Sequence, residues 1–320
     1  MEFKFDKTDK RMISYLYHHH REPLTKIAKA CKISRDQVEY RLKKYEQKGL
    51  IKKYATIFNY ESLGYNEFIV VWIKLNSSKE QKKQIRGELK ENKNVITYID
   101  VVGKYDLAID LIYKNKDEFQ RDFSEYLQKH KSIIRDYIVL ITTSITFFPL
   151  KEFGLSLPEK EFSLENSNNI SLDDMEIRIL KSLEKNGRAK IVDIARDANI
   201  SAELALYKLK QLYKNKIILG TRVIFDLEKM GYFFGNLRLK INALNKRFEK
   251  EITEYCKQHK YINAVSFGIG KYNCVIQVLY KEEKIFRNSL KEILNKFREN
   301  IQESDIILIE NEGEVKTLPF

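Results

Sequence analysis

The sequence is poor in the residues and segments that build disulfide scaffolds and membrane spans. Its 320 residues include only three cysteines and four prolines. Cys31, Cys256 and Cys274 show no paired or metal-ligand spacing, which argues against a disulfide framework and is typical of a reducing compartment. The N-terminal stretch MEFKFDKTDKRM lacks the apolar run of a signal peptide, and no later segment is long and apolar enough to span a bilayer. These absences predict a soluble cytoplasmic protein with no membrane partner.

The sequence also lacks the motifs that carry common enzyme chemistry. It contains no activated-nucleophile motif, no phosphate loop and no HExxH metal signature. His18, His19 and His20 are consecutive, so they do not share a helix face, and no cysteine or acid cluster completes a metal site. We expect these histidines at the end of the first helix, near solvent or a phosphate. We therefore predict no catalytic residue, no metal site and no cofactor.

Positive charge, by contrast, is abundant and concentrated near the N-terminus. The formal net charge is +13 and the pI is about 9.3. Residues 1–60 carry 15 Lys and Arg against 7 Asp and Glu, or +8, whereas residues 172–227 carry 11 against 8, or +3. A basic balance favours an acidic partner, nucleic acid before an anionic membrane surface.

A Gly-Lys-Tyr motif with similar apolar flanks occurs twice, as VGKYDLAIDLIY and as IGKYNCVIQVLY. Gly103 and Gly270 are 167 residues apart, and the same offset aligns residues 6–65 with 173–232 without a gap. We expect this offset to continue to the end of each copy. A constant offset over such a length indicates a duplicated unit. Between the copies, the stretch FGLSLPEKEFSLENSNNIS is typical of a linker.

Each copy begins with a helical segment. N-terminal cap signals at Asp6 and Ser34 precede apolar residues at helical spacing, and Gly49 suits the exit of a third helix. Two helices are predicted at about 24–31 and 35–48, and the following LIKKYATIFNY alternates like a short β-ribbon. Three short helices followed by a β-wing are the outline of a winged helix-turn-helix.

The remainder of each copy alternates strands and helices. Four segments of copy one have the alternation of strands: FIVVWIKL, VITYIDVV, LAIDLIYK and YIVLITTSITFF. Two segments have the spacing of helices: SKEQKKQIRGELKEN and DEFQRDFSEYLQKH. The order is βαββαβ, a ferredoxin-like unit with Gly-Lys-Tyr at its central turn. The predicted fold class is α+β, with two tandem copies of a winged helix-turn-helix followed by a ferredoxin-like domain. The predicted boundaries are winged helices at 1–60 and 172–227, ferredoxin-like domains at 61–151 and 228–320, and a linker at 152–171.

The third helix of copy one is the strongest candidate for contact with DNA. Its apolar stripe, Val38, Leu42 and Tyr45, leaves an opposite face of polar and basic side chains. Arginine can read guanine through two hydrogen bonds, while lysine suits phosphates. A solvated surface helix is the alternative interpretation, but the helix-turn-helix outline and the basic wing favour DNA. The predicted contact residues are Ser34, Arg35, Asp36, Tyr40, Arg41, Lys43, Lys44, Lys52 and Lys53.

The equivalent helix of copy two has a changed face. There Ala202, Glu203 and Leu204 stand where copy one has Arg35, Asp36 and Gln37. We expect copy one to make most of the DNA contact and copy two to be a partner or a weaker reader of a half-site.

The central turn offers the chemistry that grips an α-amino acid at both ends. Backbone N–H groups at Gly103 suit a carboxylate, and the carboxylate of Asp106 suits an amino group. Copy two has Asn273 at the position of Asp106. We therefore expect the turn of copy one, rather than that of copy two, to bind an effector.

Together these segments resemble the Lrp/AsnC (feast/famine) family of transcription regulators, here in tandem. The resemblance is carried by FDKTDKRMISYL, IAKACKISRDQVEYRLKKYEQKGLIKKY, NYESLGY and VGKYDLAI. It implies a sequence-specific regulator that binds double-stranded DNA, with a regulatory (RAM) domain that binds amino acids or similar small molecules and drives dimerisation. One departure is the turn of the helix-turn-helix, where Lys32 and Asn199 replace the usual glycine.

The resemblance also implies an effector site and an assembly. In the family the Gly-x-Tyr/Phe-Asp turn belongs to the effector site. Carried over, the effector residues are Gly103, Lys104, Tyr105, Asp106, Gly270, Lys271, Tyr272 and Asn273. A tandem chain is expected to form the family's dimer internally, as a pseudo-dimer with two unequal DNA heads, or to build a homo-oligomer.

Two other functions are compatible with parts of the sequence. Siroheme decarboxylases have similar paired units, but they carry a His-Asn-Tyr signature ahead of the central turn, and VITYIDVVGKYD and INAVSFGIGKYN contain no histidine. A protein-interaction module without DNA binding would explain the altered second head but not the +8 of residues 1–60. Pigment binding and the salt dependence of DNA binding distinguish these alternatives.

Overall fold

The computed structural model describes residues 3–153, 170–313 and 315–320, and it divides into two compact units. The first unit contains residues 3–63, 147–153 and 170–233, and the second contains 64–146, 234–313 and 315–320. The winged helices of both copies therefore belong to one unit, and the ferredoxin-like parts of both copies belong to the other. Most of the predicted linker, 152–171, lies outside the described residues.

The first unit contains two heads, each with the three helices that the sequence predicts. The first head consists of α1 (Lys7–His19), α2 (Leu24–Cys31), α3 (Arg35–Gln47) and β1 (Ile51–Phe58). The second consists of α6 (Asp174–Lys185), α7 (Ile191–Ala198), α8 (Ala202–Lys214) and β6 (Ile218–Phe225). A short 3-10 helix, η1 (Lys151–Phe153), belongs to the same unit. Capping boxes begin α1, α3 and α6, which confirms the predicted starts of these helices.

The turn between the second and third helices adopts the left-handed conformation in both heads. Lys32 has φ of 57° and Asn199 has φ of 55°. The N–H of Lys32 donates to the carbonyls of Ala28 and Lys29, which closes α2. A lysine in this conformation is sterically less favourable than the glycine or asparagine that usually occupies it.

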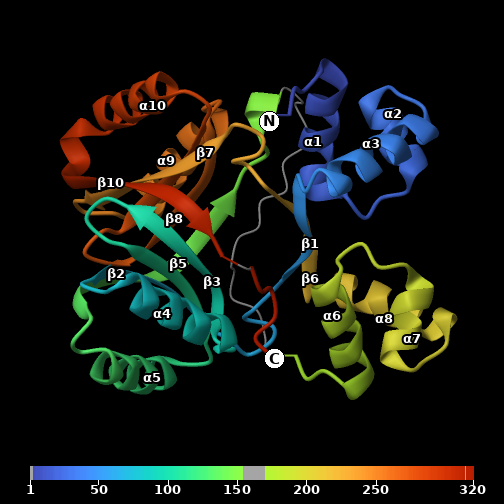
Figure 1. Cartoon of the computed structure of the whole chain (residues 1–320), viewed down its shortest axis with the longest axis horizontal. Coiled ribbons are helices and arrows are strands. Elements are labelled where there is room, and N and C mark those ends of the chain that lie inside the picture. Colours follow the sequence, from blue (N-terminus) through green and yellow to red (C-terminus); the bar gives the residue numbers. More distant parts are fainter. Residues whose placement is uncertain (1–2, 154–169, 314) are drawn as a thin grey trace. The chain divides into compact units, whose positions relative to one another are not determined.

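The predicted β-ribbon is formed between the copies. β1 and β6 pair with each other in an antiparallel two-stranded sheet, in which Tyr54 lies opposite Val223 and Thr56 opposite Thr221 (Figure 1). Each copy supplies one strand, so this pairing differs from a hairpin wing within a single head. The sheet joins the two heads through backbone hydrogen bonds.

The three histidines lie at the junction of the heads. His18 and His20 are 5% and 0% exposed, which contradicts the expectation of a position near solvent. His18 Nδ1 lies 3.4 Å from the carbonyl oxygen of Thr221, and Thr221 Oγ1 donates to the carbonyl of His18 at 3.0 Å. His20 Nε2 lies 3.1 Å from the carbonyl oxygen of Ala55. Two of these side chains are therefore structural groups that contact β1 and β6.

The second unit contains both βαββαβ sets, which confirms the predicted α+β fold. Copy one contributes β2 (Glu67–Leu75), α4 (Lys79–Glu91), β3 (Val95–Val102), β4 (Leu107–Tyr113), α5 (Lys116–Lys129) and β5 (Ile134–Phe147). Copy two contributes β7 (Phe233–Ile241), α9 (Lys246–Gln258), β8 (Ile262–Gly270), β9 (Cys274–Tyr280), α10 (Glu283–Lys296), the 3-10 helix η2 (Arg298–Asn300) and β10 (Ile301–Glu312). Within the described part of the chain, no helix is long and apolar enough to cross a membrane.

The strands of the two copies pair side by side in one continuous β-sheet. Their order is β10, β3, β4, β2, β5, β8, β9, β7, and β7 pairs back to β10. β10 of copy two therefore lies beside β3 of copy one, with Leu308 opposite Val102. The regulatory parts of the two copies are thus joined by strand pairing within one chain.

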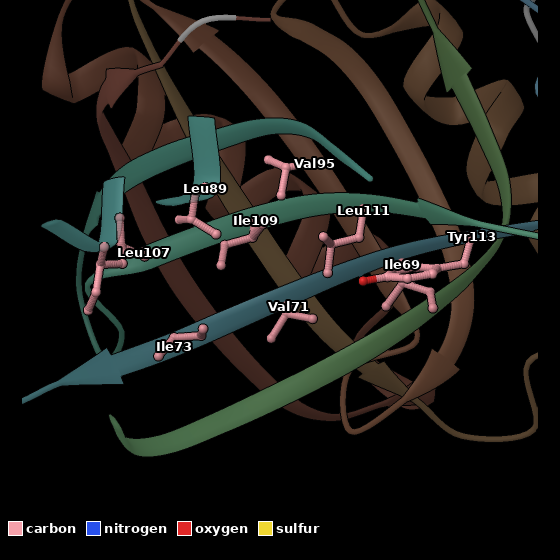
Figure 2. Packing of buried hydrophobic residues seen from close by; sticks show 10 residues of the cluster. Ile69, Val71, Ile73, Leu89, Val95, Leu107, Ile109, Leu111 and Tyr113 are labelled. Carbon is pink, nitrogen blue, oxygen red and sulfur yellow. The ribbon is translucent and has the colours of Figure 1, made fainter. Parts of the chain in front are cut away.

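Strand alternation separates two clusters of buried side chains in this unit. Ile69, Val71 and Ile73 of β2 pack with β3, β4 and α4, together with Leu89 and Ile109 (Figure 2). The intervening residue Trp72 belongs to a second cluster. That second cluster contains residues of both copies: Trp72, Val101, Tyr105, Ala108, Leu140, Val275 and Ile307.

The expected constant offset of 167 fails in one strand of this unit. Asp106 N donates to the carbonyl of Ile73, and the equivalent Asn273 N donates to that of Leu239, which is only 166 residues beyond Ile73. β2 and β7 differ by the same 166 at both ends. A one-residue deletion therefore precedes β7. One extra residue before α9, in the turn that contains Ala243 with φ of 49°, restores the register.

Candidate DNA-binding face and effector site

One exposed face of α3 brings together five of the predicted DNA contacts. They are Ser34, Arg35, Asp36, Tyr40 and Lys43. Ser34 also begins the helix, because its Oγ accepts from Gln37 N and its own N–H donates to the Gln37 side chain. Tyr40 is 68% exposed. Lys43 forms a 3.0 Å ion pair with Glu39, and this hydrogen bond lowers the pKa of Glu39. The face combines a guanidinium, an ammonium and an aromatic ring.

Arg41 lies between the helices of the head. Its Nη2 donates to Asp6 at 2.8 Å and its Nη1 donates to Asp9, whose side chain is buried. Tyr45 donates to the same Asp9 carboxylate at 2.6 Å. In the second head, Lys208 pairs in the same way with the capping carboxylate of α6. The DNA contact predicted for Arg41 is therefore not supported, because the side chain holds α3 against the start of α1.

The other three predicted basic contacts are divided among different surroundings. Lys44 is half-buried, with Nζ 4.9 Å from the ring centroid of Phe3. Lys52 is exposed on β1. Lys53 is half-buried and donates to Glu184 of α6 at 2.6 Å. Of the predicted basic wing, Lys52 is the residue free to face a ligand, whereas Lys53 joins the heads.

The equivalent face of α8 keeps part of this pattern. Tyr207 and Lys210, at the positions of Tyr40 and Lys43, are both exposed. Leu206 adds an apolar side chain that is 44% exposed, and no arginine stands at the start of the helix. The N-cap is also simpler, because only the Ser201 side chain bonds to the backbone. The second face is thus less basic and more apolar than the first.

The polar residue after each Gly-Lys-Tyr turn is hydrogen-bonded to the first strand of the βαββαβ set of its own copy, β2 or β7. Asp106 accepts from the N–H of Leu75 at 2.7 Å and from Lys74 Nζ at 3.1 Å. Asn273 accepts from the N–H of Ile241 at 2.8 Å and donates to its carbonyl at 2.9 Å. Each oxygen of Asp106 therefore already accepts one hydrogen bond from β2, and its contact with a ligand amino group stays a prediction. The Asp-to-Asn difference preserves a strand-end clamp.

The glycines of the two turns allow a close approach between the copies. A Cβ at Gly103, which has φ of 147°, would lie 2.9 Å from the carbonyl oxygen of Ile306. A Cβ at Gly270 would lie 2.3 Å from the carbonyl oxygen of Val139. Each turn therefore packs against a strand of the other copy, and any side chain in its place would displace that strand.

The tyrosines of both turns meet at one side chain that the sequence patterns did not indicate, Arg238 of β7. Its guanidinium carbon lies 5.0 Å from the ring centroid of Tyr105 and 4.7 Å from that of Tyr272. The ring of Trp72 lies 4.9 Å away. Arg238 is fully buried and pairs with Asp305, directly opposite on β10. The repeated motif thus brings two aromatic rings to a single buried cation.

The lysines of the turns and the tyrosine hydroxyls extend this cluster. Lys104 Nζ lies 5.6 Å from the ring centroid of Tyr105, and Lys271 Nζ lies 5.2 Å from that of Tyr272. Lys271 and the Tyr272 hydroxyl both bond to Glu303 at 2.8 Å. Burial, followed by the hydrogen bond to Glu303, raises the pKa of Tyr272 to about 12, and burial also raises the pKa of Tyr105. Both tyrosines are therefore protonated donors at neutral pH.

One signal in the sequence could have identified Arg238. It interrupts the apolar alternation of NLRLKI, and a charged residue inside a strand of a closed ladder requires a partner. The constant offset concealed the signal, because it aligned Arg238 with Val71. The corrected register aligns Arg238 with Trp72, which faces the same cluster.

Comparisons with known proteins support the same organisation. Residues 5–52 and 172–218 each match the winged helix-turn-helix DNA-binding family. The HTH-type transcriptional regulator FL11 of Pyrococcus abyssi is 27% identical over 118 residues, which cover 37% of this chain and 77% of that protein. An uncharacterised HTH-type transcriptional regulator of Pyrococcus horikoshii is 27% identical over 139 residues, 43% of this chain and 92% of that protein.

A solved structure matches the chain over both copies. The crystal structure of the siroheme decarboxylase NirDL aligns with 97% of this chain and 94% of that chain, at a TM-score of 0.61 and 13% identity. At this identity the likeness concerns the fold alone. It extends the similarity from a single copy to the tandem arrangement.

Proposed function

This chain belongs to the Lrp/AsnC-like proteins, with their unit present twice, and on that premise we propose that it is a sequence-specific DNA-binding regulator of transcription. The observation that carries the proposal is the exposed face of α3 within a matched winged helix-turn-helix. Relatives of this sequence are named HTH-type transcriptional regulators. The proposed partner is double-stranded DNA.

Within the first head, each exposed residue has a distinct role. Arg35 lies in the first turn of α3, where a recognition helix contacts base edges, and its guanidinium reads guanine. Lys43, two turns later, contacts phosphate, as does Lys52 on β1. Arg41 acts indirectly, since it holds α3 in place.

The two heads read DNA unequally. The pairing of β1 with β6 joins the two heads within one unit of one chain. Tyr207 and Lys210 of α8 retain a phosphate contact and a ring, but the base-reading arginine is missing. The proposed operator therefore has one strong half-site and one degenerate half-site.

A small-molecule effector is part of the proposal. The turns at Gly103–Asp106 and Gly270–Asn273 each approach a strand of the other copy and place a tyrosine against Arg238. A ligand held by Lys104, Tyr105, Lys271 or Tyr272 would therefore change how the copies pack. This coupling would reach the heads through the chain that joins the two units.

Substitutions on α3 test the DNA-binding part. Lys43→Ala should weaken binding to all duplexes about equally and lower the slope of log K against log salt by about 1. Arg35→Ala should cost roughly 1–3 kcal/mol at the preferred site and relax its sequence preference. The control is Lys83→Ala, which removes one positive charge from an exposed position on α4, outside the heads. If both α3 variants bind like the control, the assignment of this face is wrong.

An enzyme related to siroheme decarboxylase is the second candidate, and the alignment over 97% of the chain favours it. That function requires binding of a tetrapyrrole with several carboxylates. Among the described residues, Arg238 is the sole arginine or lysine that is buried, and it already pairs with Asp305. Incubation with an iron porphyrin that carries carboxylate side chains should leave its absorbance spectrum unchanged. A stoichiometric spectral shift would favour the enzyme.

A further inference from the structure

Arg238 combines complete burial with hydrogen-bonding capacity that the protein does not use. Its Nη2 bonds to Asp305, whereas Nε and Nη1 have no hydrogen-bond partner in the described part of the chain. Nε1 of Trp72, in the same side-chain cluster, is also buried without a partner among those residues. A buried N–H that lacks an acceptor costs about 1–3 kcal/mol, and more when the group is charged. These three N–H groups therefore have no bonded acceptor among the described residues.

This arrangement occurs once, although the fold contains the position twice. In copy one the matching pair across β2 and β5 is Trp72 and Ile138, which is apolar. In copy two it is Arg238 and Asp305. The ion pair is therefore not required to close the ladder, because its apolar equivalent closes the other side. A structural role alone leaves the single buried guanidinium without a reason.

The unused guanidinium donors of Arg238 and the ammonium of Lys104, which lies over the same Tyr105 ring, favour an anion. The rings of Tyr105 and Tyr272 lie against the guanidinium, and Lys104 and Lys271 lie over the same two rings. Asp305 pairs with Arg238 and Glu303 pairs with Lys271, and the second oxygen of Asp305 already accepts from the N–H of Ile306. A carboxylate is the small organic anion whose oxygens match guanidinium donors best.

Asn236 supplies one acceptor near Arg238. It lies two residues before Arg238 on β7 and so shares its face of the strand. It stands at the position of Val70 in copy one, which packs against the shared cluster. Asn236 Oδ1 is buried without a hydrogen-bond partner among the described residues. A hydroxyl group on the ligand would satisfy this single acceptor.

We propose that Arg238 and Asn236 form a binding site for a small organic acid without an ammonium group, with 2-hydroxy acids preferred. An α-ammonium has three donors, and a single acceptor at Asn236 would leave two of them buried and unpaired. It would also stand near the positive charge of Arg238. Asp106 and Asn273, which could have held it, are bonded to the backbone. The proposal deepens the effector part of the proposed function and rests on it.

Calorimetric titration of the DNA-free full chain with four three-carbon ligands tests the proposal. Lactate, propanoate, alanine and propanamide differ only in the groups at issue. At constant ionic strength, lactate should bind most tightly, propanoate more weakly, and alanine and propanamide at least about tenfold more weakly than lactate. Alanine binding as tightly as lactate would overturn the preference, and equal binding of propanamide would overturn the carboxylate contact.

Two variants locate the binding. Arg238→Met with Asp305→Ile makes this pair apolar, as the Trp72–Ile138 pair of copy one is, and replacement of a buried ion pair by apolar residues is often neutral for stability. This variant should keep its circular dichroism and lose binding of lactate and propanoate together. Asn236→Val should lower lactate binding to the level of propanoate and leave propanoate unchanged. Unchanged lactate binding in both variants would refute the site.

A DNA-retention assay, run beside the calorimetry, separates this proposal from the regulator proposal. DNA retention by the ligand-free wild-type chain tests the heads without reference to Arg238. Lactate binding with no DNA retention would leave the acid site standing and remove the regulator. DNA retention with no binding of any of the four ligands would do the reverse.

Discussion

Acidification should destabilise the first unit through His20, which is buried at the junction of the heads. His20 is 0% exposed, its Nε2 lies 3.1 Å from the carbonyl of Ala55, and its ring lies against Tyr54. Burial lowers the pKa of His20 to about 4, and the nearby guanidinium groups of Arg188 and Arg21 act in the same direction. The folded chain therefore holds this imidazole neutral, with the Nε2 proton donated to Ala55.

The direction of the pH effect follows from the two pKa values. In the unfolded chain His20 binds a proton near the ordinary histidine pKa of 6.5, whereas the folded chain binds it only near pH 4. Between these values the unfolded state carries more protons, so the free energy of unfolding falls as the pH falls through this window. The difference corresponds to roughly 3 kcal/mol once the pH is below about 4, and the contribution is constant above about pH 7.5.

Urea unfolding of the full chain at several pH values measures this contribution. His20→Gln is the matched variant, because its side-chain N–H can donate to the Ala55 carbonyl but does not titrate. Carboxylates that titrate in both proteins cancel in the difference. The wild type should lose stability relative to His20→Gln as the pH falls from about 7 to about 4.5, by about 2–3 kcal/mol. A pH-independent difference between the two proteins would refute the buried neutral state.

Substitutions at four positions test the structural roles of Arg41, of the strand-end bonds of Asp106 and Asn273, and of Lys32. Arg41→Ala should destabilise the chain by about 3 kcal/mol in urea unfolding, because it leaves the buried Asp9 carboxylate without its cation. Arg41→Lys should recover much of this loss, because Lys208 forms the equivalent ion pair in the second head. Asp106→Asn keeps an acceptor for the strand-end N–H and should cost about 1 kcal/mol, whereas Asn273→Asp loses a donor and should cost more; equal costs would contradict the clamp. Lys32→Asn should raise the free energy of unfolding by up to about 1 kcal/mol, which a slightly higher melting temperature would show. A lower melting temperature would contradict strain at this turn.

Local elements were predictable because their signals are local. Asp6 and Ser34 each bond within three residues, so the sequence indicates the starts of α1 and α3 directly. The partner of β1 was not predictable, because its strand pattern fits a hairpin wing equally well. Pairing between Thr56 and Thr221 depends on two segments that are distant in the sequence and come from different copies. Such contacts depend on the fold of both copies.

The candidate sites divide in the same way. The exposed side of α3 followed from the apolar stripe of Val38, Leu42 and Tyr45. The ion pairs of Arg41 did not follow from it, because their carboxylate partners lie at the start of another helix. Arg238 was missed because a deletion and an insertion, each of one residue, cancel over the copy and hide the local shift. A charged residue in a strand indicates a buried site only once it is known whether its position faces the core or solvent.

Selection of bound duplexes from fragmented genomic DNA, followed by sequencing, tests the central claim most directly. We predict that the wild type enriches a shared motif with one strong half-site beside a degenerate one, and that Arg35→Ala loses the strong half-site while still binding DNA. Retention of DNA without an enriched sequence would contradict the claim of sequence-specific regulation. Failure to retain any DNA, with and without lactate, would remove DNA as the partner of the α3 face.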